Sequence, residues 1–295
     1  MISSIWITGA NGQLGLELQR KLARRKRVFA TDAELDICDA TAVEKFIAEH
    51  GINTIINCAA YTNVEAAEEN AGLCYRVNEL GVKTLAEAAL KADAALIQIS
   101  TDYVFDGSKR TPYKESDSPA PLSVYGASKL AGERAMQRCG CRGAIVRTAW
   151  LYSPYGKNFM KTMAALGAER DQIKVVCDQI GSPTAADSLA AAAVKIMDNL
   201  TTQRGEIYNF SGRGPCSWSV FAAAIMHCAH NRCRVVDIES DEYPQKAARP
   251  SYSYLDCSKI ERDFGIVAEP WQSALERNMR RLRMLRRAPI TYPHP

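Results

Sequence analysis

The sequence lacks the signatures of several protein classes. It has only four histidines among 295 residues, and its ten cysteines form no C-x-x-C pair or finger-like set with them. The common zinc modules are therefore excluded. No apolar run approaches the ~18 residues that a transmembrane helix requires, and no signal peptide is apparent. We expect a cytoplasmic protein in a reducing compartment, without a membrane partner.

A strong charge of one sign is also missing. The net charge is +4, which is too small to argue for a nucleic-acid partner. The exception is the basic run "RNMRRLRMLRR" at residues 277–287. Because no aromatic residues interleave with its charges, we interpret it as a solvated or dimer-facing terminal helix, which leaves a homodimer open.

Short apolar runs alternate with amphipathic stretches along the first half of the chain. Strands are expected at "SIWITGA", "RVFATD", "NTIINCAA", "ALIQIS" and "GAIVRTAWLY", with helices between them. This pattern predicts an α/β fold with a doubly wound parallel sheet covered on both faces. The alternation weakens near residue 150, although "GEIYNFSG" still predicts a strand. We assign residues 1–150 to the sheet domain and residues 151–295 to a smaller α/β lobe interleaved with it.

Three glycines follow the first strand in "ITGANGQLG", in the pattern G-x-x-G-x-x-G. Gly9 allows a tight turn, Gly12 lets the backbone approach a pyrophosphate, and Gly15 lets the helix pack close to the sheet. The phosphates would meet free N–H groups at the N-terminus of the helix. A dinucleotide cofactor is therefore expected.

The residues after the second strand bear on the choice of cofactor. Asp32 stands where an acid accepts from the adenosine ribose 2′-OH, which favours NADH, although a cap or turn role is the alternative. The basic residues 24–27 precede that strand and could instead meet the 2′-phosphate of NADPH. Asp36 or Asp39 could lie near the adenine. After the third strand, Ala60, Tyr61 and Thr62 would line the nicotinamide side, although Tyr61 could equally pack in the core.

Tyr125 and Lys129 in "VYGASK" are spaced i and i+4, so on a helix they share one face. The ammonium would favour the phenolate and bring the pKa of the tyrosine closer to neutrality. Such a pair suits proton transfer to a carbonyl or from an alcohol. Thr101, at the end of the fourth strand, could stabilise a developing negative oxygen beside the tyrosine. Capping and turn formation are the alternatives for Thr101 and Asp102.

Taken together, "GANGQLGLELQR", "STDYVFDG" and "VYGASKLAGE" resemble the extended short-chain dehydrogenase/reductase superfamily. Within it, "RTAWLY", "NFMKTM", "DQIGSPT" and "ARPSYSYLD" are similar to the dTDP-4-dehydrorhamnose reductase family. This resemblance implies a Rossmann-type domain and a C-terminal lobe that binds a nucleotide sugar. The implied activity is reduction of dTDP-4-dehydro-L-rhamnose to dTDP-L-rhamnose with NADPH or NADH, in surface polysaccharide biosynthesis.

The resemblance also implies roles for individual residues. Tyr125 would donate the proton, Lys129 would hold the nicotinamide ribose, and Thr101 would stabilise the transition state. The substrate would contact Thr101, Asp102, Trp150 and Arg249. The cofactor would contact Gly9, Gly12, Gln13, Leu14, Gly15, Asp32, Asp36, Ile37, Ala60, Tyr61, Thr62, Ile99, Tyr125 and Lys129. From the residues alone, the Trp150 indole suits a sugar face and the Arg249 fork suits a diphosphate, whereas core packing and a surface arginine are the alternatives.

Metal use and rival functions are the remaining questions. Some members of this family dimerise through Mg²⁺ held by carboxylates; Glu17 matches one such position, and Asp187 stands where another member has a glutamate. The basic C-terminus offers no acid for a third, and its arginines would oppose a cation, so Mg²⁺ is disfavoured. Two other functions fit the same motifs. One is another nucleotide-sugar reductase or epimerase, and the other is a regulatory subunit of the methionine adenosyltransferase type, against which the full Thr/Tyr/Lys set argues.

Overall fold

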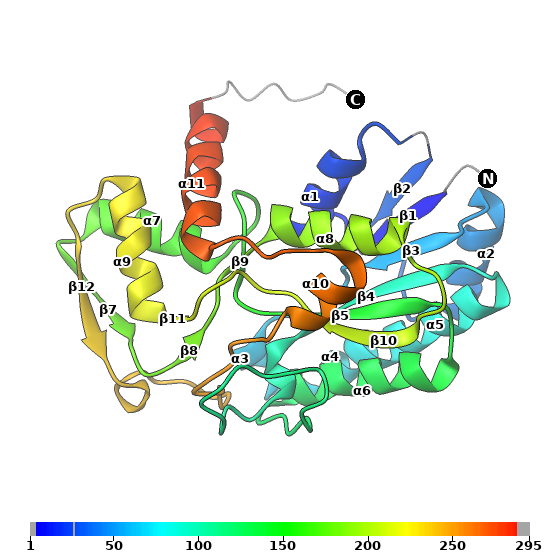
Figure 1. Ribbon diagram of the computed structural model, residues 1–295, viewed down its shortest axis with the longest axis horizontal. Helices are drawn as coiled ribbons and strands as arrows, with labels where there is room; N and C mark the ends of the chain where they lie inside the picture. The colour runs from blue at the N-terminus through cyan, green and yellow to red at the C-terminus, as the bar shows by residue number, and fades with distance from the viewer. Residues whose placement is uncertain (1–3, 26, 288–295) are drawn as a thin grey trace.

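A six-stranded parallel sheet forms the centre of the computed structural model, which describes residues 4–25 and 27–287 (Figure 1). Its strand order is β10-β5-β4-β3-β1-β2. The strands are β1 (Ile5–Thr8), β2 (Val28–Thr31), β3 (Thr54–Asn57), β4 (Ala95–Thr101), β5 (Gly143–Thr148) and β10 (Arg204–Asn209). The prediction of a doubly wound parallel sheet is confirmed.

Side chains of each strand alternate between two apolar cores. On β1, Ile5 and Ile7 face one core, whereas Trp6 faces the other. The first core is covered by α1 (Gln13–Leu22), α8 (Ala186–Asp198) and α10 (Ser258–Phe264). The second is covered by α2 (Ala40–His50), α5 (Gly81–Lys91) and α6 (Val124–Cys139). Because helices bury both faces, the strands read as continuous apolar runs in the sequence.

The sheet draws on both halves of the chain. Its edge strand β10 pairs in parallel with β5, with Ile207 opposite Ile145, and α8 packs against α1. Residues beyond 150 therefore supply both a strand of the sheet and much of the cover on one of its faces (Figure 1).

The rest of the C-terminal half forms a smaller lobe beside the carboxyl ends of the strands (Figure 1). A third apolar cluster holds it together, centred on Tyr152, Phe221 and Trp271. Its helices are α7 (Phe159–Glu169), α9 (Trp218–Ala229) and α11 (Trp271–Arg287). Its short strands pair as β6 (Leu151–Tyr152) with β9 (Thr184–Ala185), β7 (Gln172–Val176) with β12 (Arg234–Ile238), and β8 (Ile180–Gly181) with β11 (Cys216–Ser217).

Two expected elements are interrupted. The long helix after the third strand is divided into α4 (Ala71–Tyr75), a π-helical turn (Arg76–Leu80) and α5, and it is preceded by the short α3 (Val64–Ala67). The strand expected in "GAIVRTAWLY" breaks between β5 and β6, where Trp150 adopts a φ of 46°. Within the described residues, no helix has both the length and the hydrophobicity needed to cross a bilayer.

Candidate active site

The glycine loop joins β1 to α1 and leaves the N-terminus of that helix without a side-chain cap. Gly9 has a φ of 61°, and a Cβ there would lie 2.6–2.8 Å from backbone atoms of Cys58 and Ala59. A Cβ on Gly15 would lie 2.4–2.7 Å from backbone atoms of the loop itself. The loop therefore packs too closely for larger residues, and the uncapped N–H groups suit an anion.

Gln13 and Leu14 begin α1, but their side chains are engaged elsewhere. Leu14 is buried in the core. The Gln13 Oε1 atom accepts a hydrogen bond from Asn158 Nδ2 at 2.9 Å, which links the loop to the C-terminal lobe. These two residues can offer a pyrophosphate their backbone N–H groups.

Asp32, expected at the adenosine end of the cofactor, follows β2 and accepts a hydrogen bond from the glycine loop. Its Oδ2 atom accepts from the Asn11 N–H at 2.8 Å, and its Oδ1 atom accepts from the Ala33 N–H at 3.0 Å. Asp36 is exposed and pairs with Arg76 at 2.5 Å, whereas the Ile37 side chain is buried in the core. The expected turn role of Asp32 is thus present, and the ribose contact stays a prediction.

The basic run before β2 is largely committed to other partners. Arg25 pairs with Asp198 at 2.7 Å, and Arg27 donates to the carbonyl oxygen of His50 at 2.7 Å. Lys26 lies outside the described residues. The 2′-phosphate role of this run stays a prediction.

The loop after β3 is held by a residue of the π-helical turn. Asn78, which is fully buried, accepts from the Tyr61 N–H at 2.9 Å and donates to the Tyr61 carbonyl oxygen at 3.1 Å. It also donates to Ser128 Oγ on α6 at 3.0 Å. Residues 60–62 are therefore fixed relative to the helix that carries Tyr125.

Tyr125 and Lys129 lie on α6, whose first turn is capped twice. Ser123 Oγ accepts from the Gly126 N–H at 3.2 Å, and Glu68 accepts from the Val124 N–H at 2.9 Å. Thr101 ends β4, which packs against this helix, and its hydroxyl lies close to the Tyr125 side chain. The structure thus brings Thr101 and Tyr125 together at the carboxyl end of the sheet.

Lys129 is buried, and its Nζ atom donates to the Ile99 carbonyl oxygen at 2.6 Å. Burial lowers the pKa of Lys129 to about 8, and the negative charge of Glu133 opposes this shift. Burial raises the pKa of the Tyr125 phenol above its usual range, and the nearby Thr101 hydroxyl opposes this rise. The expected lowering of the Tyr125 pKa by Lys129 is therefore wrong for this structure, because the ammonium is directed to a carbonyl and desolvation dominates.

Asp102 and Tyr103 follow Thr101 in the chain and also lie near Tyr125. Asp102 is almost fully buried, and burial raises its pKa to about 6, opposed by the Ser253 and Thr101 hydroxyls. Its Oδ2 atom is buried without a hydrogen-bond partner among the described residues. The Tyr103 ring packs edge-on against Tyr125, with centroids 5.6 Å apart. The unpaired carboxylate oxygen is an acceptor that a hydroxyl-bearing ligand would satisfy.

Trp150 and Arg249 are more constrained than the sequence indicates. The Trp150 indole stacks on Trp218 with centroids 3.5 Å apart and planes 7° apart, and Gly181 lies against the same ring. Packing thus occupies much of the indole, and its substrate contact stays a prediction. Arg249 is not a free surface arginine, because its Nη2 atom pairs with Glu65 at 2.7 Å.

Sequence reasoning missed several of these residues. Tyr103 lies inside the quoted "STDYVFDG", so the motif itself could have identified it. Asn78 and Glu65 fall within helical stretches that carry no local sign of a π-helical turn or of a distant arginine. Ser253 belongs to the C-terminal lobe and lies far from Asp102 in sequence, so no spacing pattern could indicate that its hydroxyl affects the Asp102 pKa.

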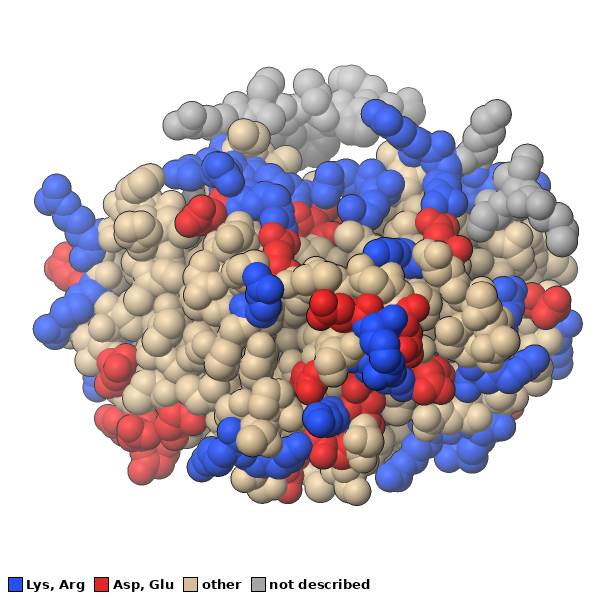
Figure 2. Space-filling view, in the orientation of Figure 1, with Lys and Arg blue, Asp and Glu red and all other residues tan. Residues whose placement is uncertain are grey.

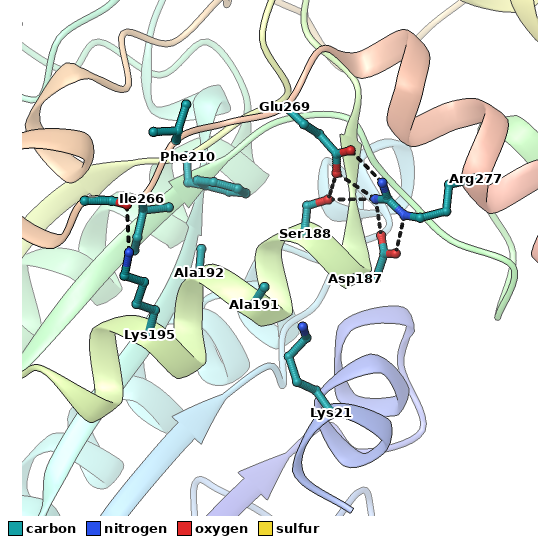
Figure 3. Close-up of a pocket in the computed structure, with 12 residues that line it drawn as sticks. Lys21, Asp187, Ser188, Ala191, Ala192, Lys195, Phe210, Ile266, Glu269 and Arg277 are labelled. Carbon is teal, nitrogen blue, oxygen red and sulfur yellow. Dashed lines mark hydrogen bonds and ion pairs between the residues drawn. The ribbon is translucent and has the colours of Figure 1, made fainter.

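The carboxylates considered for Mg²⁺ are neutralised by arginines. Arg281 binds Glu17 at 2.7 Å and Asp187 at 3.2 Å, so it bridges α1 and α8 from α11. Arg277 lies between Asp187 and Glu269 beside a cavity of about 470 Å³ (Figure 3). None of the predicted cofactor or substrate residues lines that cavity. Since guanidinium groups already occupy these oxygens, the residues do not fit a Mg²⁺ ion.

The basic C-terminal run is helical as expected, and its charges divide between two roles. Arg277 and Arg281 point inward onto carboxylates, whereas Arg280 and Arg283 are exposed. Figure 2 shows lysine and arginine side chains gathered around α11. Part of the run is therefore an internal ion-pair network.

These features meet at one place in the fold. The uncapped α1, the loop fixed by Asn78, and Tyr125 with Lys129 all lie where the strands of the parallel sheet end. Ligands bind at this edge in open α/β sheets. The fold and the site define an oxidoreductase of the extended short-chain dehydrogenase/reductase type.

Comparison with known proteins gives the family. Residues 3–284 match the sequence family described as RmlD substrate binding domain. The chain is 42% identical over 287 residues to a dTDP-4-dehydrorhamnose reductase of Aggregatibacter actinomycetemcomitans, covering 93% of this chain and 98% of that protein. The chain therefore belongs to the dTDP-4-dehydrorhamnose reductase family.

Solved structures of similar proteins agree with this family assignment. A dTDP-4-dehydrorhamnose reductase from Clostridium acetobutylicum superimposes with a TM-score of 0.91 at 41% identity, covering 95% of this chain and 100% of that one. One from Bacillus anthracis, in complex with NADP, gives a TM-score of 0.91 at 40% identity over the same shares.

Proposed function

We propose that this protein reduces dTDP-4-dehydro-L-rhamnose to dTDP-L-rhamnose. The observation that carries the proposal is that Thr101, at the end of β4, and Tyr125, on α6, lie together at the carboxyl edge of the sheet whose strand β1 leads into the glycine loop. A reductase needs a proton donor at the carbonyl that accepts hydride, and burial keeps the Tyr125 phenol protonated. The residues of 1–150 hold the cofactor in this scheme, and the C-terminal lobe holds the nucleotide sugar.

The nicotinamide cofactor supplies the hydride to C4 of the keto sugar. Tyr125 donates its proton to O4, and the Thr101 hydroxyl stabilises the negative charge that develops on the same oxygen. Lys129, fixed by the Ile99 carbonyl, holds the nicotinamide ribose. Asp102 accepts from a sugar hydroxyl through its unpaired oxygen.

The cofactor site suits a dinucleotide diphosphate at the N-terminus of α1, with its adenosine end between Asp32 and Asp36. NADH is favoured by the acid after β2, whereas NADPH is favoured by the NADP bound to the relative from Bacillus anthracis. The ratio of kcat/KM for the two cofactors decides between them.

The test is turnover of dTDP-4-dehydro-L-rhamnose with each cofactor, followed by loss of nicotinamide absorbance. Tyr125→Phe removes the proton donor and should lower kcat by about 10² to 10⁴ while leaving cofactor binding intact. Full turnover by that variant would refute the assignment of Tyr125. Tightly retained cofactor without net oxidation of NAD(P)H would instead favour an epimerase.

A further inference from the structure

One carboxylate fastens residues 246–249 of the C-terminal lobe to α3. Glu65 Oε2 accepts from the Lys246 N–H at 2.7 Å and from the Ala247 N–H at 3.3 Å. Its Oε1 atom accepts from Arg249 Nη2 at 2.7 Å. A charged acceptor with three donors is a strong and directional anchor, so the position of Arg249 depends on Glu65.

The helix that carries Glu65 is itself tied to the cofactor side. α3 follows directly after residues 60–62, and Asn63 caps it by accepting from the Ala66 N–H at 3.2 Å. Asn78 fixes Tyr61 through both its N–H and its carbonyl oxygen. Glu65 therefore stands on a rigid platform next to the catalytic helix.

Arg249 retains donors that the protein does not use. Its Nη2 atom is committed to Glu65, but its Nε atom is buried with no partner among the described residues. Burial raises the pKa of the Tyr103 phenol to about 12, the charge of the nearby Arg249 guanidinium opposes this rise, and the Tyr103 ring packs against Tyr125. An oriented cation near Tyr103, the residue that packs against the catalytic tyrosine, is suited to an anionic ligand.

We propose that Glu65 is a positioning residue for the diphosphate of the nucleotide sugar, because it sets the Arg249 fork at the edge of the site before substrate arrives. The inference rests on the proposed function, which supplies the diphosphate. Pre-organising the guanidinium avoids its ordering cost on binding, so loss of Glu65 should weaken the ligand without altering the chemistry.

A neighbouring acid supplies a matched control. Glu69 lies four positions further along, past the end of α3, and among the described residues its ion pair is with the side chain of Lys246, exposed on both sides. Glu69→Gln removes a charge of the same sign from the same region without touching Arg249.

The experiment measures dTDP affinity by calorimetry at saturating NADPH, together with steady-state kinetics. For Glu65→Gln we expect the Kd of dTDP and the KM of the nucleotide sugar to rise about tenfold. The kcat value and the Kd of NADPH should stay within about twofold of wild type. Glu69→Gln should match wild type, and Glu65→Asp, which keeps the charge, should lose less than Glu65→Gln.

A double-mutant cycle tests whether Glu65 acts through Arg249. In an Arg249→Met background, Glu65→Gln should cause no further loss of dTDP affinity. Additive losses, or an unchanged Kd in a folded Glu65→Gln variant, would overturn the inference. If wild type binds dTDP in a Glu65-dependent manner but does not reduce the keto sugar, the proposed function fails and the positioning role stands.

Discussion

The ion pair between Glu133 and Arg147 fastens the catalytic helix α6 to strand β5, and breaking it provides a quantitative test. Both side chains are 1% exposed, and Arg147 binds the two carboxylate oxygens at 2.9 and 2.7 Å. Ser100 Oγ donates to the same carboxylate at 2.5 Å. Glu133→Gln leaves the arginine charge buried without its counter-ion.

Removing one partner of a buried pair costs about 3–5 kcal/mol, a large part of a typical stability of about 5–15 kcal/mol. We expect the free energy of unfolding to fall by about 3 kcal/mol. In urea, where m is about 1–3 kcal/mol/M, the midpoint should fall by about 1 M or more.

The same substitution should change the pH profile. Glu133 raises the pKa of Lys129, which burial lowers to about 8, so removing the acid should lower that pKa further. The ammonium is the form present below the pKa. The alkaline limb of kcat/KM should therefore move to lower pH in Glu133→Gln.

Two controls make this result interpretable. Glu87→Gln breaks an exposed i,i+4 pair with Lys83 and should change neither measurement. The double variant Glu133→Leu/Arg147→Met replaces both charges by apolar groups and should recover most of the lost stability. A loss below about 1 kcal/mol in Glu133→Gln, or an alkaline limb that stays in place, would refute the reasoning.

Three further outcomes follow from the site. Because burial raises the pKa of Asp102 to about 6, the KM of the nucleotide sugar should rise as pH falls through 6, and Asp102→Asn should abolish this dependence. A flat profile in wild type would contradict it. Gly15→Ala should raise the Kd of NADPH about tenfold through backbone overlap, whereas Gly72→Ala, with nothing within 4 Å of the new Cβ, should not. EDTA should leave activity unchanged because Arg281 occupies the carboxylates of Glu17 and Asp187, and activity restored by Mg²⁺ would disprove this.

The fold class could be predicted because its signals are local. Each strand of the sheet is an apolar run, and each covering helix has a buried stripe that its own sequence displays. The place of "GEIYNFSG" could not be predicted in the same way. Its strand character is visible, but nothing in those residues indicates that β10 pairs with β5.

The site residues also differ in whether local sequence signals could predict them. The glycine loop and the Tyr125–Lys129 pair are encoded by spacing within a few residues, so the sequence places them on a turn and on one helix face. Arg249 and Glu65 are 184 positions apart, and Arg281 and Glu17 are 264 apart, so their pairing appears only in the folded chain. The pKa of Tyr125 was misjudged because spacing gives its neighbour on the helix but not the extent of its desolvation.

The position of β10 at the sheet edge limits how the two parts of this chain can evolve separately. A chain cut near residue 150 would expose the hydrogen-bonding edge of β5 and uncover the apolar side of α1 where α8 packs. Such a fragment would tend to aggregate and would not persist as an independent domain. The residues on either side of position 150 are therefore expected to diverge as one unit, and recombination between distant relatives at that point should yield insoluble chains.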